Sequence, residues 1–254
     1  MTTFTPTKAT GSHFYRYQSA EHLDRLKPII LKHELYLPSV AQLNDPLDCR
    51  PKISPISDED LVTFRRNDYI NRNPVLALDL LRQDEDNIRD LIQKRGVEWF
   101  NSELSKILNA GMEQFRVYSL TKRFDNFGLW AKYADGHKGY CLEFANEGDL
   151  FKHAFEVFYG ESVPFDVNDP GRDAMFLVRK RLDWSNEEEV RLILPAGKGS
   201  KVRIEPRWLT RIILGMEMSP ENEAQIRQWA KVREPVLLVV RAHLDGLNQD
   251  LCFK

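Results

Sequence analysis

Two glutamates and an arginine stand at every second position of one segment of the sequence: Glu187, Glu189 and Arg191. In an extended strand, side chains two residues apart project from the same face. Two carboxylates on one face can hold the hydroxyl groups of a sugar, and a guanidinium beside them can satisfy part of their charge. The spacing therefore predicts a ligand-binding strand face. The alternative interpretation is a solvated strand face that carries an ordinary ion pair.

A second group of candidates lies in the middle of the chain, where Ser119 and Thr121 precede an aromatic segment. Trp130, Tyr133 and His137 follow at spacings of three and four, which place side chains on one face of a helix. Such a face can stack on a planar ring and donate hydrogen bonds. Alternatively, the two large aromatic residues are core anchors and the histidine ends the helix.

Near the N-terminus, an arginine stands between two tyrosines in Tyr15-Arg16-Tyr17. A fork-shaped guanidinium beside aromatic rings suits phosphate binding, although an ordinary surface arginine has the same neighbours. The segment Asn44-Asp45-Pro46, with Asp48, offers oxygen ligands for a divalent cation. An Asx turn explains the same residues, so we expect no metal site.

Several standard catalytic motifs are absent from the sequence: there is no GxxxxGK[ST], GxGxxG, GxSxG or HExxH. This disfavours phosphate-loop ATPases, Rossmann dehydrogenases, esterases with a nucleophile elbow and zincin proteases. The 36 Lys and Arg residues against 38 Asp and Glu residues give a net charge of −2, which argues against a general nucleic-acid-binding coat. The three cysteines, Cys49, Cys141 and Cys252, lie far apart without pairing or zinc-ligand spacing, as expected in a reducing compartment.

The hydropathy pattern predicts a cytoplasmic protein without a membrane partner. The longest aliphatic run, Val236 to Val240, is far shorter than the ~20 residues of a membrane-spanning helix. The N-terminal segment has no apolar signal core. A length of 254 residues fits one domain, residues 1–254, with an inserted lobe.

The elements that must position these residues alternate irregularly between strands and helices. This order predicts an α+β fold with a mixed, largely antiparallel sheet core. Residues of about 58–114 are highly charged and helically periodic, so we expect a helical insertion there. Strands are expected at 13–17, 35–37, 115–121, 139–144, 155–159, 187–194, 202–204, 209–214 and 235–242, and further helices at 19–31, 124–134, 174–181 and 220–232.

The order of these segments resembles a bacterial family, the domain of unknown function numbered 2971. The resemblance covers nearly the whole chain outside the helical middle, and the family carries no established activity. It rests on Tyr15-Arg16-Tyr17, Leu43 to Asp48, Ser119-Leu120, Leu129-Trp130 with Tyr133 and His137, Trp184 with Glu187, Glu189 and Arg191, and Ile212 to Gly215.

A weaker resemblance is more informative about chemistry. Arg16, the pair Ser119-x-Thr121 and the pair Glu187-x-Glu189 are similar to the Arg…Ser-x-Ser/Thr…Glu-x-Glu arrangement of ADP-ribosyltransferases. This resemblance implies an ADP-ribosyltransferase-like fold and NAD as the substrate, with no metal.

The resemblance also implies a role for each residue. Glu189 would stabilise the positive charge that builds on the ribose when the nicotinamide bond breaks, and Ser119 would support it. Glu187 would position or deprotonate the acceptor, Arg16 would bind the pyrophosphate, and Tyr133 would stack on nicotinamide. The other candidates for binding NAD are Tyr17, Thr121, Trp130, His137 and Arg191.

The favoured function is therefore that of an NAD-cleaving ADP-ribosyltransferase or NAD glycohydrolase, of the kind that serves bacteria as a toxin or phage-defence effector. Two alternatives are a non-catalytic nucleotide- or ligand-sensing module, and a metal-dependent nuclease using Asp45, Asp48 and the two glutamates. The acceptor (protein, nucleic acid, small molecule or water) and the oligomeric state stay open. The favoured interpretation requires that Arg16, Ser119 and Glu189 meet in one cleft.

Overall fold

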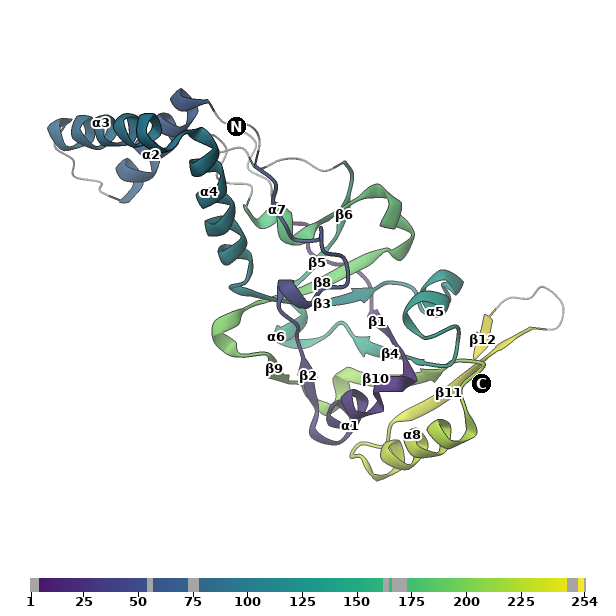
Figure 1. Cartoon of the computed structure of the whole chain (residues 1–254). Helices are drawn as coiled ribbons and strands as arrows, with labels where there is room; N and C mark the ends of the chain where they lie inside the picture. Colours follow the sequence, from purple (N-terminus) through teal and green to yellow (C-terminus); the bar gives the residue numbers. More distant parts are fainter. Residues whose placement is uncertain are drawn as a thin grey trace.

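An eight-stranded mixed sheet organises the protein, in the order β12-β11-β10-β4-β1-β3-β8-β5 (Figure 1). The structure is a computed structural model that describes residues 5–53, 57–72, 78–161, 165, 173–245 and 251–253. The strands of this sheet are β1 (His13–Gln18), β3 (Phe115–Thr121), β4 (Tyr140–Ala145), β5 (Ala154–Glu156), β8 (Glu189–Pro195), β10 (Leu209–Leu214), β11 (Leu238–Leu244) and β12 (Leu251–Phe253).

Neighbouring strands of the sheet run antiparallel except β10 and β11, which pair in parallel. The centre of the sheet is covered on both faces, and every residue of β4 is buried. Two short ladders lie outside it: β2 (Glu34–Tyr36) pairs with β9 (Lys201–Arg203), and β6 (Phe158–Tyr159) pairs in parallel with β7 (Arg179–Lys180). The fold is thus mixed α/β with a large, mostly antiparallel sheet.

Two helices pack together over one face of the sheet: α1 (Leu23–Lys32) and α8 (Pro220–Val232). Their apolar residues, such as Leu26, Ile30 and Ile226, belong to one buried cluster with residues of the central strands. Ser219 begins α8 as its N-cap, accepting a hydrogen bond from the Asn222 amide, and Pro220 follows at the first helical position, where its missing N–H is not needed.

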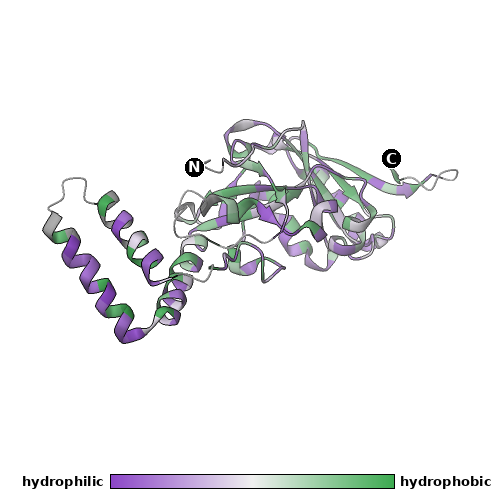
Figure 2. Ribbon diagram, turned by 90° about the horizontal axis from the view of Figure 1, so that it is seen from above, coloured by the Kyte–Doolittle hydropathy of each residue, from purple (hydrophilic) through white to green (hydrophobic). Residues whose placement is uncertain are grey.

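Three helices project away from the sheet as an arm (Figures 1 and 2). They are α2 (Asp58–Arg72), α3 (Leu78–Arg95) and α4 (Val97–Met112), so the described residues of the expected insertion are helical; residues 73–77 lie outside the description. The base of the arm is fixed to the body, because Leu104 and Met112 of α4 share a buried cluster with Val117 of β3. None of the helices described here is long and apolar enough to cross a membrane.

The remaining elements are short and lie between the strands and the longer helices along the chain. They are α5 (Phe127–Tyr133), α6 (Gly148–Phe151), α7 (Asp173–Val178), and the 3-10 helices η1 (Ala20–His22), η2 (Val40–Gln42), η4 (Leu182–Glu187), η5 (Ala196–Lys198) and η6 (Pro206–Trp208).

Candidate functional site

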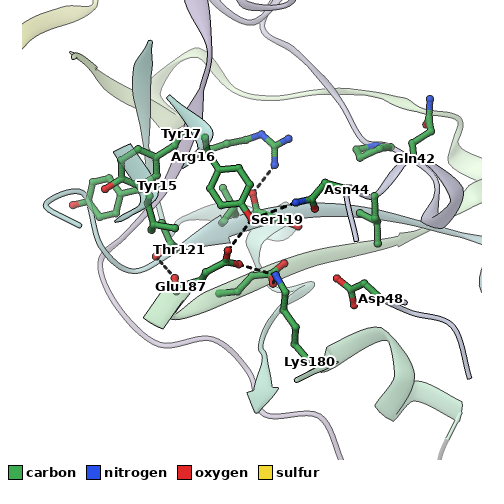
Figure 3. A pocket seen from close by; sticks show the side chains of 16 residues that line it. Tyr15, Arg16, Tyr17, Gln42, Asn44, Asp48, Ser119, Thr121, Lys180 and Glu187 are labelled. Carbon is green, nitrogen blue, oxygen red and sulfur yellow. Dashed lines mark hydrogen bonds and ion pairs between the residues drawn. The ribbon is translucent and has the colours of Figure 1, made fainter. Parts of the chain in front are cut away.

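A cavity of about 220 Å³ lies beside the junction of β1 and β3 (Figure 3). These two central strands pair at one position, where Tyr15 stands opposite Thr121. Next to this pair, the Arg16 side chain reaches between the strands, and its Nη1 donates to the Ser119 carbonyl oxygen at 2.6 Å. A side chain therefore replaces part of the backbone ladder, and the space beside it is open to a ligand.

The residues of the favoured interpretation meet in this cavity. Its lining includes Arg16 from β1, Ser119 and Thr121 from β3, Tyr133 from α5, and both Glu187 and Glu189. Tyr15 and Tyr17 add two further aromatic side chains. Segments more than a hundred residues apart in the sequence thus contribute to one cleft.

Lys180 joins the two glutamates of the cavity. Its Nζ lies 2.7 Å from Glu187 Oε2 and 2.9 Å from Glu189 Oε2. All three residues are less than a tenth exposed. The β6–β7 ladder places Lys180 here, and the same ladder brings the Tyr159 hydroxyl within 2.7 Å of the Glu189 amide, from which it accepts a hydrogen bond.

Arg191 lies directly behind Glu189 and is completely buried. Its Nε donates to Glu189 Oε1 at 2.9 Å, and its Nη2 donates to Asp48 Oδ2 at 2.5 Å. Asp48, Glu187 and Glu189 carry three negative charges, against two positive charges on Lys180 and Arg191. These five groups have a formal charge of −1, which the partly exposed Lys132 ammonium, 3.3 Å from Glu187 Oε1, balances.

The charges of this group are strongly stabilised. Burial raises the pKa of the Glu189 carboxyl, but Arg191 and Lys180 outweigh it and lower that pKa to about 2. Burial lowers the pKa of the Lys180 ammonium, but Glu189 and Glu187 outweigh it and raise that pKa above its usual range. Glu189 is therefore ionised at neutral pH, and Lys180 cannot act as a base there.

Glu187, the outer glutamate, is bound by Tyr133 through the carboxylate oxygen that Lys180 does not contact. The Tyr133 hydroxyl donates to Glu187 Oε1 at 2.7 Å and accepts from Asn44 Nδ2 at 3.4 Å. Burial, followed by the hydrogen bond to Glu187, raises the pKa of the Tyr133 phenol. Lys132 adds a partly exposed ammonium 3.3 Å from Glu187 Oε1, and this ammonium also stands 3.3 Å from the centre of the Trp184 ring. Glu187 thus lies at the rim, among cationic and phenolic donors.

The two glutamates converge by a different route from the one that their spacing predicts. The expected strand over 187–194 begins only at Glu189, because Glu187 ends the 3-10 helix η4 and Glu188 adopts a left-handed conformation with φ of 43°. The prediction of a continuous strand face from residue 187 was therefore wrong. Glu188 points outward, where its carboxylate pairs with Arg123 at 3.2 Å.

Thr121, rather than the Ser119 side chain, contacts the glutamate segment. Thr121 stands opposite Glu189 in the β3–β8 ladder, and its hydroxyl donates to the Glu187 carbonyl oxygen at 2.7 Å. Ser119 stands opposite Arg191, and its carbonyl oxygen serves Arg16. Thr121 therefore contacts the backbone of the glutamate segment, whereas the described contact of Ser119 is from its carbonyl oxygen to Arg16.

Three of the residues expected to bind NAD lie outside the cavity lining: Trp130, His137 and Arg191. Trp130 is fully buried, donates from Nε1 to the Phe124 carbonyl oxygen at 3.0 Å, and packs edge-on against Tyr17. The His137 ring stacks on Trp130 with 5.7 Å between centroids, and burial lowers the pKa of that imidazole. Their positions correct the expectation of ligand contact, because they support the cavity wall from behind.

Lys180 and Tyr159 belong to the site although the spacing of motifs gives no reason to choose them, and Asn44, considered above as a metal ligand, instead donates to the Tyr133 hydroxyl. Lys180 stands between Arg179 and Arg181, where a basic run usually indicates a solvated surface. Asp48, considered above as a metal ligand, is instead the partner of Arg191. Among the residues that the structure describes, no group of three or more His, Cys, Asp or Glu side chains is arranged to hold a metal ion.

No protein-family model and no solved structure matches the chain. Among curated proteins, the chain is similar to the sulfite reductase [NADPH] hemoprotein beta-component of Lysinibacillus sphaericus (strain C3-41), with 34% identity over 88 residues. The match covers 35% of this chain and 14% of that protein. It is thus a local similarity to a small part of a much longer chain.

Proposed function

We propose that this protein cleaves NAD at the bond between nicotinamide and ribose, as an ADP-ribosyltransferase or NAD glycohydrolase, and that its sheet is ADP-ribosyltransferase-like. The observation that carries the proposal is that Arg16, Ser119 and the two glutamates line one cavity. These residue types match the substrate: a guanidinium for phosphate, and carboxylates for a sugar that becomes positively charged.

The charge of the site favours this reaction. When the bond between C1′ and the pyridinium nitrogen breaks, both electrons go to the nitrogen, neutral nicotinamide leaves, and the ribose carries the positive charge. Glu189 is ionised and held in place by ion pairs with Arg191 and Lys180. A fixed negative charge that needs no rearrangement stabilises such a cation efficiently.

The size of the cavity fits one end of the dinucleotide. Its volume of about 220 Å³ is below the ~300–1,000 Å³ of pockets that enclose a whole drug-sized ligand. We infer that the nicotinamide and its ribose enter, beside Tyr133, while the phosphates remain at the mouth. Arg16 supports this arrangement, since it lines the cavity and its guanidinium has further N–H donors beside the Nη1 group that binds the Ser119 carbonyl oxygen.

The second half of the reaction is assigned to the outer glutamate. The acceptor attacks C1′ from the side opposite the leaving nicotinamide and gives up one proton, to Glu187 or to solvent. Lys180 and Tyr133 already donate to Glu187, so this carboxylate orients the acceptor better than it removes a proton from it. Water as the acceptor gives ADP-ribose, and a protein, nucleic acid or small molecule gives an ADP-ribosylated product.

The test is nicotinamide release from NAD by the purified wild-type protein and by Glu189→Gln. We expect the wild type to release nicotinamide and Glu189→Gln to release it roughly 10²–10³-fold more slowly. This is the usual effect of removing one electrostatic group at a reacting centre. Glu187→Gln should reduce transfer to an acceptor more than simple hydrolysis. Absence of nicotinamide release in the wild type, with a broad set of candidate acceptors present, would refute the proposal.

Glu188→Gln is the matched control, because it makes the same chemical change one residue away. Its carboxylate is exposed and pairs with Arg123 outside the cavity, so the rate should stay near that of the wild type. An equal loss in Glu188→Gln and Glu189→Gln, with both variants folded, would show that the effect is not local to the cavity.

A non-catalytic nucleotide-binding module is the second candidate function. The observation that favours it is that the described hydrogen-bonding partners of both cavity glutamates are already in place: Lys180 and Tyr133 for Glu187, and Lys180 and Arg191 for Glu189. Such a module would bind NAD or a related nucleotide, measurable by calorimetry, without releasing nicotinamide. Binding lost in Arg16→Ala, together with no turnover in the wild type, would identify this function.

A further inference from the structure

Lys180 lies between the two carboxylates of the cavity, and neither the motif spacing nor the family resemblance gives it a role. Its ammonium makes charge-assisted hydrogen bonds to Glu187 at 2.7 Å and to Glu189 at 2.9 Å. The ammonium is also 4.9 Å from the centre of the Trp184 ring. One buried cation therefore contacts both carboxylates to which the proposed function assigns work.

We propose that Lys180 is the positioning residue that keeps Glu187 and Glu189 side by side in their ionised forms. The inference rests on the proposed function as far as catalysis is concerned, because it deepens the same site. Lys180 itself is not assigned contact with the reacting atoms. It acts through the two carboxylates.

The charges around this pair come from several elements. Arg191 of β8 faces Glu189, and Asp48 faces Arg191 from the other side, beside the Cys49 thiol. Lys132 and Tyr133 of α5 face Glu187. The Tyr159 hydroxyl of β6 accepts from the Glu189 amide.

Removing Lys180 from this group would leave three carboxylates, of Asp48, Glu187 and Glu189, facing one buried guanidinium and the partly exposed Lys132 ammonium. Two neighbouring carboxylates that share a site cannot both stay ionised easily, and one of them takes up a proton at a higher pH. The lysine therefore determines how far the pH can fall before the pair loses one of its charges. A residue with only a packing role would not have this effect.

The decisive variant is Lys180→Met, compared with Lys180→Arg. Methionine keeps much of the side-chain volume of lysine. This matters because Lys180 and Asp48 also line a second cavity of about 470 Å³, and a smaller residue at position 180 would join the two cavities. In Lys180→Met we expect the acid limb of the pH profile of nicotinamide release to move up by about one to three pH units. Lys180→Arg, which restores the charge, should return the acid limb toward that of the wild type.

Lys122→Met is the matched control. Lys122 also forms an ion pair, with Glu156 at 2.5 Å, but both side chains are about one-third exposed and lie outside the cavity lining. Its pH profile should follow that of the wild type. An unshifted acid limb in a folded Lys180→Met protein, or an equal shift in Lys122→Met, would overturn the assignment of Lys180.

A second measurement separates this inference from the proposed function. The side-chain carboxyl resonances of Glu187 and Glu189, assigned with the two Gln variants in protein labelled with ¹³C-glutamate, can be titrated without substrate. Lys180→Met should show one of these resonances titrating at higher pH than in the wild type, by about one to three pH units.

If the resonances shift in this way but the wild type releases no nicotinamide, the proposed function fails and the role of Lys180 stands. If nicotinamide is released and neither resonance shifts, the role of Lys180 fails alone. If Lys180→Met does not fold, Lys180→Gln is titrated instead, with the same two outcomes.

Discussion

Replacing Arg191 by methionine should destabilise the protein strongly, because this guanidinium is the structural partner of two buried carboxylates. Arg191 is fully buried, and it donates to Asp48 at 2.5 Å, to Glu189 at 2.9 Å and to the Leu177 carbonyl oxygen at 2.9 Å. Removing one partner from a buried ion pair costs about 3–5 kcal/mol, since the remaining charge stays out of water without compensation. A loss of this size is a large part of the ~5–15 kcal/mol that stabilises a typical domain.

The assay is urea unfolding at neutral pH, with Arg207→Met as the control. Arg207 also pairs with a carboxylate, that of Glu205 at 2.8 Å, but both side chains are more than half exposed, so its loss should cost less than about 1 kcal/mol. The destabilisation by Arg191→Met should shrink as the pH falls toward about 4, because carboxyls without a cationic partner are then protonated. If Arg191→Met costs no more than Arg207→Met, Arg191 is not the structural partner of the two buried carboxylates.

Two further predictions concern the neighbouring groups. Arg16→Ala should raise KM for NAD with little change in kcat, since a phosphate contact is made equally in the ground and transition states. Steady-state kinetics measures both constants, and an unchanged KM would show that Arg16 does not bind the substrate. The pKa of Glu189 lies well below the ordinary 4.5 because of Arg191 and Lys180, so its ionised form should stabilise the fold above pH 4.5, and this contribution should be lost as the pH falls toward 2. Urea unfolding across that range should show the loss in the wild type, and Glu189→Gln should lack this component of the pH dependence.

Elements with a clear period and a clear boundary could be predicted from the sequence. The helix expected at 220–232 and the strands expected at 115–121 and 209–214 have the predicted bounds in the structure. In the helix, Ser219 and Pro220 fix the start by standard capping chemistry. A proline inside a helix usually kinks or ends it, yet α1 continues through Pro28 from Leu23 to Lys32. Packing of Leu26 and Ile30 in the buried cluster stabilises the helix beyond its local preference.

The candidate site was less predictable, because it depends on contacts between distant segments. The period-two spacing predicted that Glu187 and Glu189 share a strand face. Both do line one cavity, but Glu187 lies before the strand, and their convergence depends on a left-handed residue at Glu188, which no local pattern indicated. Lys180 reaches the pair through a two-residue ladder with β6. The spacing of residues in the sequence cannot indicate such a contact, since it depends on how two short strands pair.

The cavity and the stability of the sheet are linked through one residue. A sheet gains stability when each backbone carbonyl finds an N–H partner, and the single ladder pair between β1 and β3 leaves the Ser119 carbonyl to the Arg16 side chain. That side chain has five N–H donors in a fixed fork, so it can hold the strand and still offer donors to a phosphate. Lysine lacks this fork of donors. Arginine therefore suits this position better, because one side chain must hold the Ser119 carbonyl oxygen and also bind a phosphate. The opening in the sheet and the anion-binding group beside it are therefore parts of one arrangement, and binding of a phosphate at Arg16 should stabilise the same strand junction that positions Thr121 against the glutamates.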